Sequence, residues 1–369
     1  MTIGIRLGFE LELLAPAGSS RLELGRAIAQ AIGGRVERRF HMDAEPSRAA
    51  GVELFHHLTP AFAVLDATGA ERCTLVDDIT IRDDLDATAA PEPGWYRIVS
   101  DDRRLLRLVE RSCDPAAPIE SVLLPVAEQF GVGITRHDRF HRVDDAHGAT
   151  IAIAAPLPGE RQRPCEIVTA PIAADHASRL DELLAPARAL GFTIPVEAAV
   201  HLHADADLVR EPRVMRNLVR LVQPYREVLR WLVATNPRCR RLGPLPSELD
   251  DLVEEQGFAE ATWADVRGRL AEVPLSKYAD LNLKNAVVPP LGKDTVEWRI
   301  LPGAIDAAPV LEAAALFEAL LRRAARADAP VRRHDVVAPG WDGAVELLDE
   351  LDLPRDGKWL ARQTVEVGW

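Results

Sequence analysis

The stretch GFELEL at residues 8–13 alternates acidic and apolar residues near the start of the chain. Residues two apart in a β-strand point to the same face, so the alternation predicts a strand over Ile3 to Leu14 with Glu10 and Glu12 on one side. On its own, such a strand is typical of a half-solvated sheet in which the glutamates face water. The pattern becomes decisive for the fold because it occurs twice more.

The same spacing returns in VHLH at residues 200–203 and in VEWRI at residues 296–300. The polar positions of the three predicted strands hold glutamates, two histidines (His201 and His203) and an arginine (Arg299). Carboxylates gathered on one face of a sheet repel one another, and their pKa values rise unless a cation lies among them. If the three strands share a sheet, a divalent-metal site on its polar face is therefore the leading hypothesis.

Each polar pair also has a simpler interpretation. The two histidines could be satisfied by backbone groups or water, and Glu297 with Arg299 could form an exposed ion pair that contributes little stability. However, Trp298 and Ile300 beside Arg299 predict a central strand. An arginine on the open face of a central strand is better explained by a phosphate or carboxylate ligand. Glu197 would lie on the histidine face and extend its ligand-type chemistry.

The composition narrows the class of protein. The 369 residues, 47% of them apolar, suffice for one large domain or two modest ones. A formal charge of −13 argues against nucleic acid or an anionic membrane as a partner, because either would be repelled. We see no membrane span and no signal peptide, and the four cysteines form no CxxC pair. We therefore expect a cytoplasmic protein, and the excess of arginine over lysine is typical of a bacterial, high-GC genome.

Helix signals separate the strand patterns. Ser20 and Glu23 form a capping box that predicts a helix ending at Gly33 and Gly34. Further strands are expected at 52–55, 61–65, 79–81, 95–99, 150–155 and 165–169, and further helices at 105–111, 119–130, 175–190, from 212 with a break at Pro224, from 262, and at 306–325. Polar-faced strands separated by helices predict an α+β fold on a mainly antiparallel sheet with one open face.

Several other chemistries lack support. The chain contains no GxxxxGK[ST], GxGxxG, GxSxG or HExxH motif, so it shows no sign of a P-loop, a dinucleotide fold, a hydrolase elbow or a zincin. The histidines at positions 41, 56, 57, 137 and 141 are interpreted as surface residues.

Five short motifs follow one another in a recognisable order. They are GxExE at 8–12, EIVTAP at 166–171, HxH at 201–203, KYxxLNL at 277–283 and TxExR at 295–299. This series resembles the amidoligase family, relatives of glutamate–cysteine ligase and glutamine synthetase, over about residues 3 to 325. The resemblance implies a curved, mainly antiparallel sheet with helices on one face, whose concave side binds Mg–ATP and joins a carboxylate to an amine.

The resemblance also implies a domain plan. Residues 1–325 would form the catalytic domain and residues 326–369 a C-terminal appendage. The family sets an Asp-x-Ser-Leu element shortly before the EIVT strand. The nearest match here, residues 100–105, lacks the serine that should follow the aspartate and lies some sixty residues upstream. We therefore expect an insertion around 102–160, and a ligand role for Asp101 is left open.

The family pattern also assigns roles to individual residues. It would place five residues around the divalent cations, with His203 as a close neighbour: Glu10, Glu12, Glu166, His201 and Glu297. Arg299, together with Glu297, would be catalytic, and Arg299 would hold a phosphate group or the acyl phosphate. The KYxxLNL motif, whose role we expect to be nucleotide binding or scaffold, contains Lys277, Tyr278 and Asn282. The implied cofactors are ATP and Mg²⁺, with Mn²⁺ as an alternative metal.

Three functions remain open at this point. The first is an ATP- and Mg²⁺-dependent carboxylate–amine ligase that acts through an acyl phosphate on small-molecule or peptide substrates. The second is a metal-dependent hydrolase or phosphoesterase on the same Glu/His face, and the third is a non-catalytic nucleotide-binding relative. Arg299 beside Glu297, and the lack of an Asp/His-rich loop motif, favour the first. The sequence leaves the acid, the amine and the oligomeric state unnamed.

Overall fold

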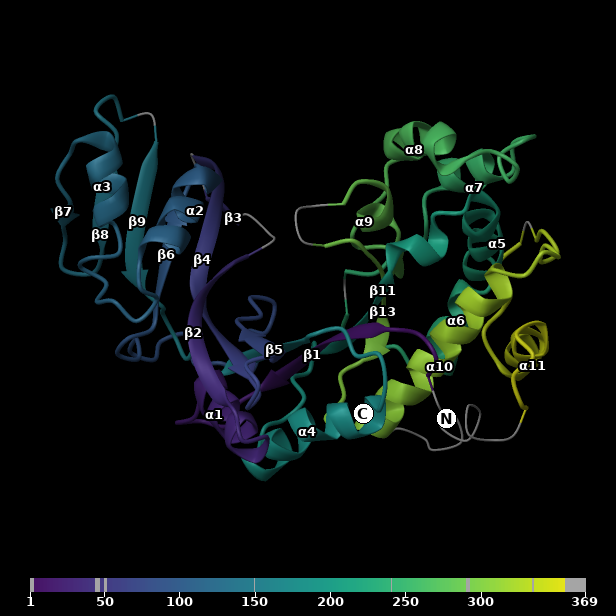
Figure 1. The fold of residues 1–369 in the computed structure, drawn as a ribbon, viewed down its shortest axis with the longest axis horizontal. Helices are drawn as coiled ribbons and strands as arrows, with labels where there is room; N and C mark the ends of the chain where they lie inside the picture. Colours follow the sequence, from purple (N-terminus) through teal and green to yellow (C-terminus); the bar gives the residue numbers. More distant parts are fainter. Residues whose placement is uncertain are drawn as a thin grey trace. The chain divides into compact units, whose positions relative to one another are not determined.

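The computed structural model describes residues 3–43, 47–49, 52–148, 150–239, 241–289, 293–333 and 335–355. The chain forms two compact units (Figure 1). The first contains Met1–Glu12, Pro171–Leu184 and Val196–Trp369, and the second contains Leu13–Ala170 and Ala185–Pro195. Both are built on antiparallel strands with helices, so the chain has the predicted α+β class with a mainly antiparallel, open sheet.

The strands of the first unit are hydrogen-bonded in the order β12-β13-β11-β1, and all these pairings are antiparallel. They are β1 (Leu7–Leu14, in this unit up to Glu12), β11 (Ala199–Asp205), β12 (Leu281–Asn282) and β13 (Thr295–Pro302). The strand β1 starts later than predicted, and the Leu7 amide at its start donates to the Ile172 carbonyl at 2.9 Å. All three motif stretches therefore lie on neighbouring strands.

Helices cover the apolar side of β13. The Trp298 ring packs 4.9 Å from the ring of Phe317 in the long helix α10 (Ala307–Ala324), which matches its predicted range closely.

The remaining elements are α4 (His176–Ala189, in this unit up to Leu184), η1 (Ala206–Val209), α5 (Pro212–Val222), α6 (Arg226–Leu232), α7 (Ser247–Val253), α8 (Trp263–Glu272), α9 (Lys284–Val287) and α11 (Trp341–Glu350). The predicted break at Pro224 is confirmed, because α5 ends and α6 begins around it.

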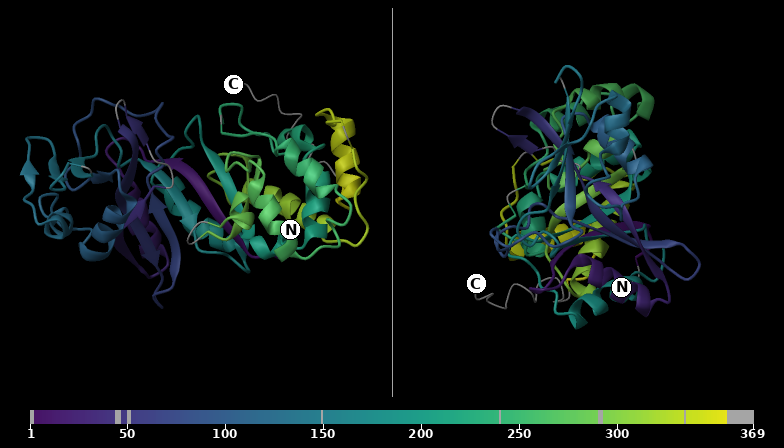
Figure 2. Two further views of the ribbon diagram at one scale, coloured as in Figure 1. Left: turned by 90° about the horizontal axis from the view of Figure 1, so that it is seen from above. Right: turned by 90° about the vertical axis from the view of Figure 1, so that its left-hand side faces the viewer.

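The helices of the first unit also pack on one another. Helix α10 contacts α5, and α11 contacts α6 (Figures 1 and 2). Trp298 and Ile300 are buried to 2% and 1% exposure, so the prediction that β13 is a central strand is confirmed. Its apolar side chains face the helices, which leaves Glu297 and Arg299 for the other side of the strand.

The strands of the second unit follow the order β10-β5-β4-β6-β9-β8-β7, with β2 and β3 also paired to β4. They are β2 (Arg35–Met42), β3 (Ser47–Ala49), β4 (Val52–Leu65), β5 (Glu71–Val76), β6 (Tyr96–Ser100), β7 (Thr135–Arg136), β8 (His141–Asp144), β9 (Ile151–Pro156) and β10 (Pro164–Thr169). Two predicted short runs are one continuous strand, β4. The strand predicted at 79–81 is wrong, because the Asp78 carboxylate accepts from the Thr80 amide at 2.8 Å and makes a turn there.

The helices that lie wholly within the described part of this unit are α1 (Arg21–Ala31), α2 (Arg103–Ser112) and α3 (Leu124–Phe130). The predicted capping box is present at the start of α1. Helix α3 is shorter than predicted, because Pro125 is tolerated only in its first turn. Side chains of α2 and α3 pack with Leu58 and Ile98 of the sheet in one hydrophobic core.

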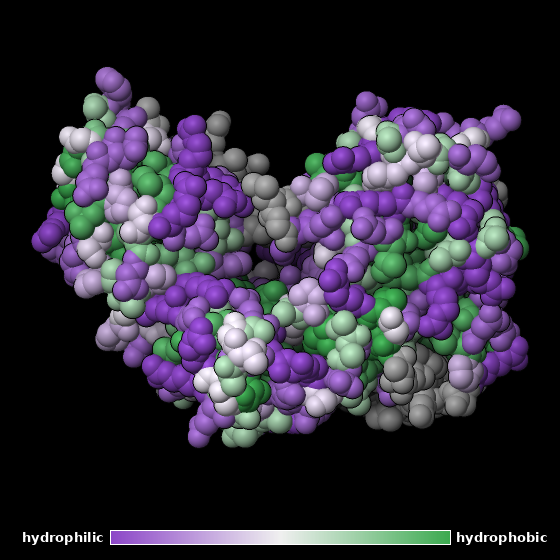
Figure 3. Space-filling view, in the orientation of Figure 1, coloured by the Kyte–Doolittle hydropathy of each residue, from purple (hydrophilic) through white to green (hydrophobic). Residues whose placement is uncertain are grey.

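No helix among the described residues combines the length and the hydrophobicity that crossing a membrane requires. The face drawn in Figure 3 is mostly hydrophilic, with hydrophobic residues in scattered groups. This surface agrees with a chain in which 27% of the residues are charged.

Candidate metal centre

The strand register brings the three motifs into contact. Glu10 of β1 stands opposite His201 of β11. On the other edge of β11, His203 stands opposite Glu297 of β13, which in turn faces Asn282 of β12. Directly opposed residues share a face of the sheet, so the polar positions of all three motifs converge on one side.

Glu10, His203 and Glu297 form the tightest group. Each offers one ligand atom, and these atoms all lie within 4.8 Å of one another. His203 Nε2 is 3.2 Å from Glu10 Oε1 and 3.9 Å from Glu297 Oε1. Two carboxylates and an imidazole at these separations can hold one divalent cation.

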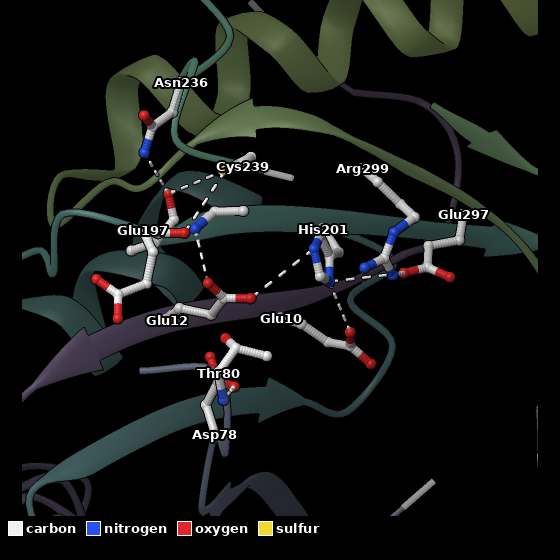
Figure 4. A network of polar contacts seen from close by, with 12 residues as sticks. Glu10, Glu12, Asp78, Thr80, Glu197, His201, Asn236, Cys239, Glu297 and Arg299 are labelled. Atoms are coloured by element: carbon white, nitrogen blue, oxygen red, sulfur yellow. Dashed lines mark hydrogen bonds and ion pairs between the residues drawn. The ribbon is translucent and has the colours of Figure 1, made fainter. Parts of the chain in front are cut away.

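His201 and Glu12 extend this group along the sheet (Figure 4). His201 Nδ1 hydrogen-bonds to Glu10 Oε2 at 3.1 Å, and its Nε2 lies 3.8 Å from Glu12 Oε1. The other oxygen of Glu12 accepts a hydrogen bond from the Ala199 amide at 2.7 Å. The backbone of β11 therefore orients Glu12, and His201 connects it to Glu10.

These side chains are withdrawn from water. Exposure is 8% for Glu10, Glu12 and His201 and 4% for Glu297. The alternative that the glutamates are the solvated face of a strand is therefore wrong. A buried carboxylate is costly unless a charge or several hydrogen bonds compensate it, so the centre must contain cations.

Two basic side chains supply part of that compensation. Arg299 Nη1 forms an ion pair with Glu297 Oε1, and the Arg299 side chain is 15% exposed. Lys293 Nζ lies 3.3 Å from Glu10 Oε1, although the Lys293 side chain is 52% exposed. The carboxylates are thus interleaved with positive charges even when no metal is considered.

The pKa values follow from this arrangement. Burial alone would raise the pKa of Glu10, but the charges of His203 and Lys293 and the hydrogen bonds of both imidazoles hold it well below its usual value. Burial would also raise the pKa of Glu297, which His203, Arg299 and His201 lower instead. Burial would lower the pKa of His203, yet the carboxylates of Glu10 and Glu297 raise it. The two carboxylates therefore favour a proton on His203, and a metal at Nε2 would compete with that proton.

Outer contacts orient the three ligands. His203 Nδ1 hydrogen-bonds to Thr295 Oγ1 at 3.0 Å, while its Nε2 faces Glu10 Oε1 at 3.2 Å. With the proton on Nδ1, the Nε2 lone pair points to the carboxylates, as a metal ligand should. Asn282, 1% exposed, donates from Nδ2 to Glu297 Oε2 at 2.8 Å and accepts from the Lys284 amide at 3.0 Å. The donor set therefore fits a divalent cation.

Other predicted site residues lie elsewhere. Glu166 belongs to β10 of the second unit, opposite Val76 of β5, and its role as a metal ligand stays a prediction. Tyr278 is a surface residue, 36% exposed, whose ring centroid lies 5.2 Å from Lys277 Nζ and 5.6 Å from the Arg241 guanidinium. Asn282, from the same motif, instead contacts Glu297.

Sequence reasoning missed two residues of the centre, Thr295 and Lys293. Thr295 lies two residues before Glu297, so the strand period could have placed it on the same face. Lys293 comes from the segment before β13, and its only signal was that it is one of three lysines between positions 277 and 293. Asp101, left open as a ligand, accepts from Thr150 Oγ1 at 2.6 Å and from the Ile151 amide at 3.0 Å in the second unit.

Comparison with known proteins identifies one protein family. Searches of curated proteins and of solved structures found no match. The sequence model of one protein family, described as "Putative amidoligase enzyme", matches residues 4–321 and so includes every motif residue named above. The chain therefore belongs to the amidoligase family.

Proposed function

We propose that this protein is an ATP-dependent carboxylate–amine ligase whose reaction centre is the Glu10, His203 and Glu297 group with Arg299 beside it. The observation that supports the proposal best is the buried convergence of two carboxylates and an imidazole with a guanidinium already held at its edge. A ligase that activates an acid as an acyl phosphate needs bound cations to neutralise the transferred phosphoryl group. Family membership supports ligase chemistry in general.

Each group has a distinct part in this proposal. Glu10, His203 and Glu297 would hold Mg²⁺ or Mn²⁺, which would supply a Lewis acid for the phosphate oxygens. Arg299 would hold the transferred phosphoryl group. Its Nη1 is engaged by Glu297, but its buried Nε bonds to nothing in the described part of the chain and keeps a donor available. Glu297 thus serves both as a ligand and as the residue that positions Arg299.

The nucleotide is proposed to use the KYxxLNL segment. The exposed ring of Tyr278 can stack on a base, as aromatic side chains do with nucleobases. Lys277 and Arg241 flank that ring and can meet phosphate oxygens. The substrates are proposed to be a small-molecule or peptide carboxylate and an amine.

The test is a turnover assay with substrate omission. Phosphate release should require metal, ATP and an acid, and the matching amine should stimulate it. A screen of amino acids, dicarboxylates and polyamines for ADP release, followed by mass spectrometry of the product, identifies the pair. Phosphate release from phosphoesters without ATP would support the hydrolase, and ATP binding without turnover in any mixture would support the non-catalytic relative.

Arg299→Lys provides the matching variant. It keeps the charge but loses the planar fork, so it should lower turnover at least about tenfold while changing ATP affinity much less. Arg220→Lys is the control, because Arg220 forms a two-bond pair with Glu254 at 2.6 Å for each bond, in the same unit but with no contact to the centre. Full activity in Arg299→Lys would contradict the role of Arg299.

A further inference from the structure

Arg97, in the second unit, is a half-buried arginine whose guanidinium is paired with no carboxylate of the described residues. Buried and half-exposed residues alternate along β6, so Tyr96 and Ile98 face the core under α2 and α3 while Arg97 and Val99 face the opposite side. The Arg97 guanidinium makes no hydrogen bond and no ion pair with any residue in the described ranges. Arginine stays charged at all ordinary pH values, so this charge needs compensation from elsewhere.

The carboxylate whose charge acts on Arg97, that of Asp77, is already shared by two other arginines. The Asp77 side chain is 2% exposed and forms ion pairs with Arg161 and, at 3.9 Å, with Arg21. Two guanidinium groups therefore pair with this carboxylate, and Arg97 feels its charge without forming an ion pair with it. The guanidinium of Arg97 therefore remains as an excess local positive charge, although the whole chain has a formal charge of −13.

A histidine lies beside Arg97 on the same face. His57 of β4 stands opposite Val99, which makes it the diagonal neighbour of Arg97 across the strands. Burial and the positive charges of Arg97 and His56 lower the pKa of His57 to about 4. The imidazole is therefore neutral at pH 7 and adds no positive charge beside Arg97. His57, interpreted from the sequence as a surface residue, is half-buried on strand β4.

The side chains next to Arg97 on β9 and β6 are apolar and partly open. By strand register, Ala155 of β9 stands opposite Arg97, and Ile153 stands opposite Val99. Val99, Ile153 and Ala155 are all half-exposed. A guanidinium surrounded by accessible apolar side chains suits an organic molecule that carries an anionic group at one end.

We propose that Arg97 and His57 form a binding site for the anionic head group, phosphate or carboxylate, of an organic ligand. The fork of Arg97 binds two oxygens of the head group, and the neutral imidazole of His57 lines the site beside it without competing as a cation. Val99 and Ile153 contact the apolar part of the ligand. The site lies within the second unit and does not depend on the proposed ligase function.

The test uses the full-length protein and Arg97→Met, which keeps the length of the side chain but removes its charge. Inorganic phosphate and acetate serve as probes in calorimetric titrations and melting experiments, and their comparison identifies the head group. At a probe concentration ten times the Kd, the wild-type protein should melt about 3 °C higher, and Arg97→Met should lose this shift. Without a probe, Arg97→Met should melt at the wild-type temperature or above it, because an uncompensated charge has been removed.

Arg142→Met is the matched control. Arg142 lies on the same face, opposite Ile153, but already pairs with Asp144, so this variant should keep the response to the probe. His57→Gln should weaken binding a few-fold without abolishing it. The proposal is overturned if neither probe stabilises the wild-type protein, if Arg97→Met responds as the wild type does, or if Arg97→Met melts lower without a probe.

Discussion

Replacing Lys293 by methionine should make the protein bind divalent metal more tightly. The Lys293 ammonium lies 3.3 Å from Glu10 Oε1, where it shares a carboxylate that the metal needs. A metal must therefore displace this ammonium or bind against its repulsion. Methionine has a similar length and carries no charge, so the variant removes the competitor and leaves Glu10, His203 and Glu297 in place.

The expected size follows from the geometry. Two unit charges 3.3 Å apart interact by roughly 1 kcal/mol in water, and the 52% exposed side chain justifies the dielectric constant of water rather than that of the interior. One kcal/mol corresponds to about a fivefold lower Kd. The gain should shrink at high salt, because the exposed ammonium is screened.

Calorimetric titration with Mn²⁺ and with Mg²⁺ measures the effect. Lys284→Met is the control, because the side chain of Lys284 is exposed. Lys284 reaches the centre through its backbone amide, which donates to Asn282, and the substitution keeps that amide. That variant should bind metal as the wild type does. Unchanged or weaker metal binding by Lys293→Met would refute the reasoning, because it would show that the ammonium does not compete for Glu10.

Three further outcomes are expected. Glu297→Gln should weaken Mn²⁺ binding at least about tenfold in calorimetry. It should also lower the stability of the metal-free protein in urea by about 1–3 kcal/mol, because the Arg299 guanidinium loses its charged partner. Asn282→Ala should weaken metal binding about 10–100-fold, because Asn282 orients Glu297. The control Asn236→Ala removes another buried amide, which bonds to the backbone, so it should lower the melting temperature without changing metal binding. The pKa of His57 is lowered to about 4, so the native state resists its protonation, and stability should fall as the pH drops from about 6.5 to 4. His57→Gln should flatten that decline in urea titrations by about 1–2 kcal/mol after allowance for partial exposure, and an unchanged pH profile would show that the imidazole does not resist protonation.

The local sequence was sufficient to predict the strands of the metal centre. Alternation with a period of two is a property of consecutive residues, so GFELEL, VHLH and VEWRI each revealed a polar face without any knowledge of partners. The capping box at Ser20 and the break at Pro224 are equally local, because one depends on hydrogen bonds within a turn and the other on a missing amide. Resemblance to a family added the expectation that the three faces meet.

Tertiary structure alone decided which atoms meet. Glu10 and Glu297 lie almost the whole chain apart, and they converge only because β11 pairs with β1 on one edge and β13 on the other. That order depends on the packing of entire strands and helices, which no local pattern specifies. The same reason explains why Lys293 and Arg97 were missed: whether an arginine or lysine has a partner depends on the residues that folding brings near it, and not on its neighbours in the sequence.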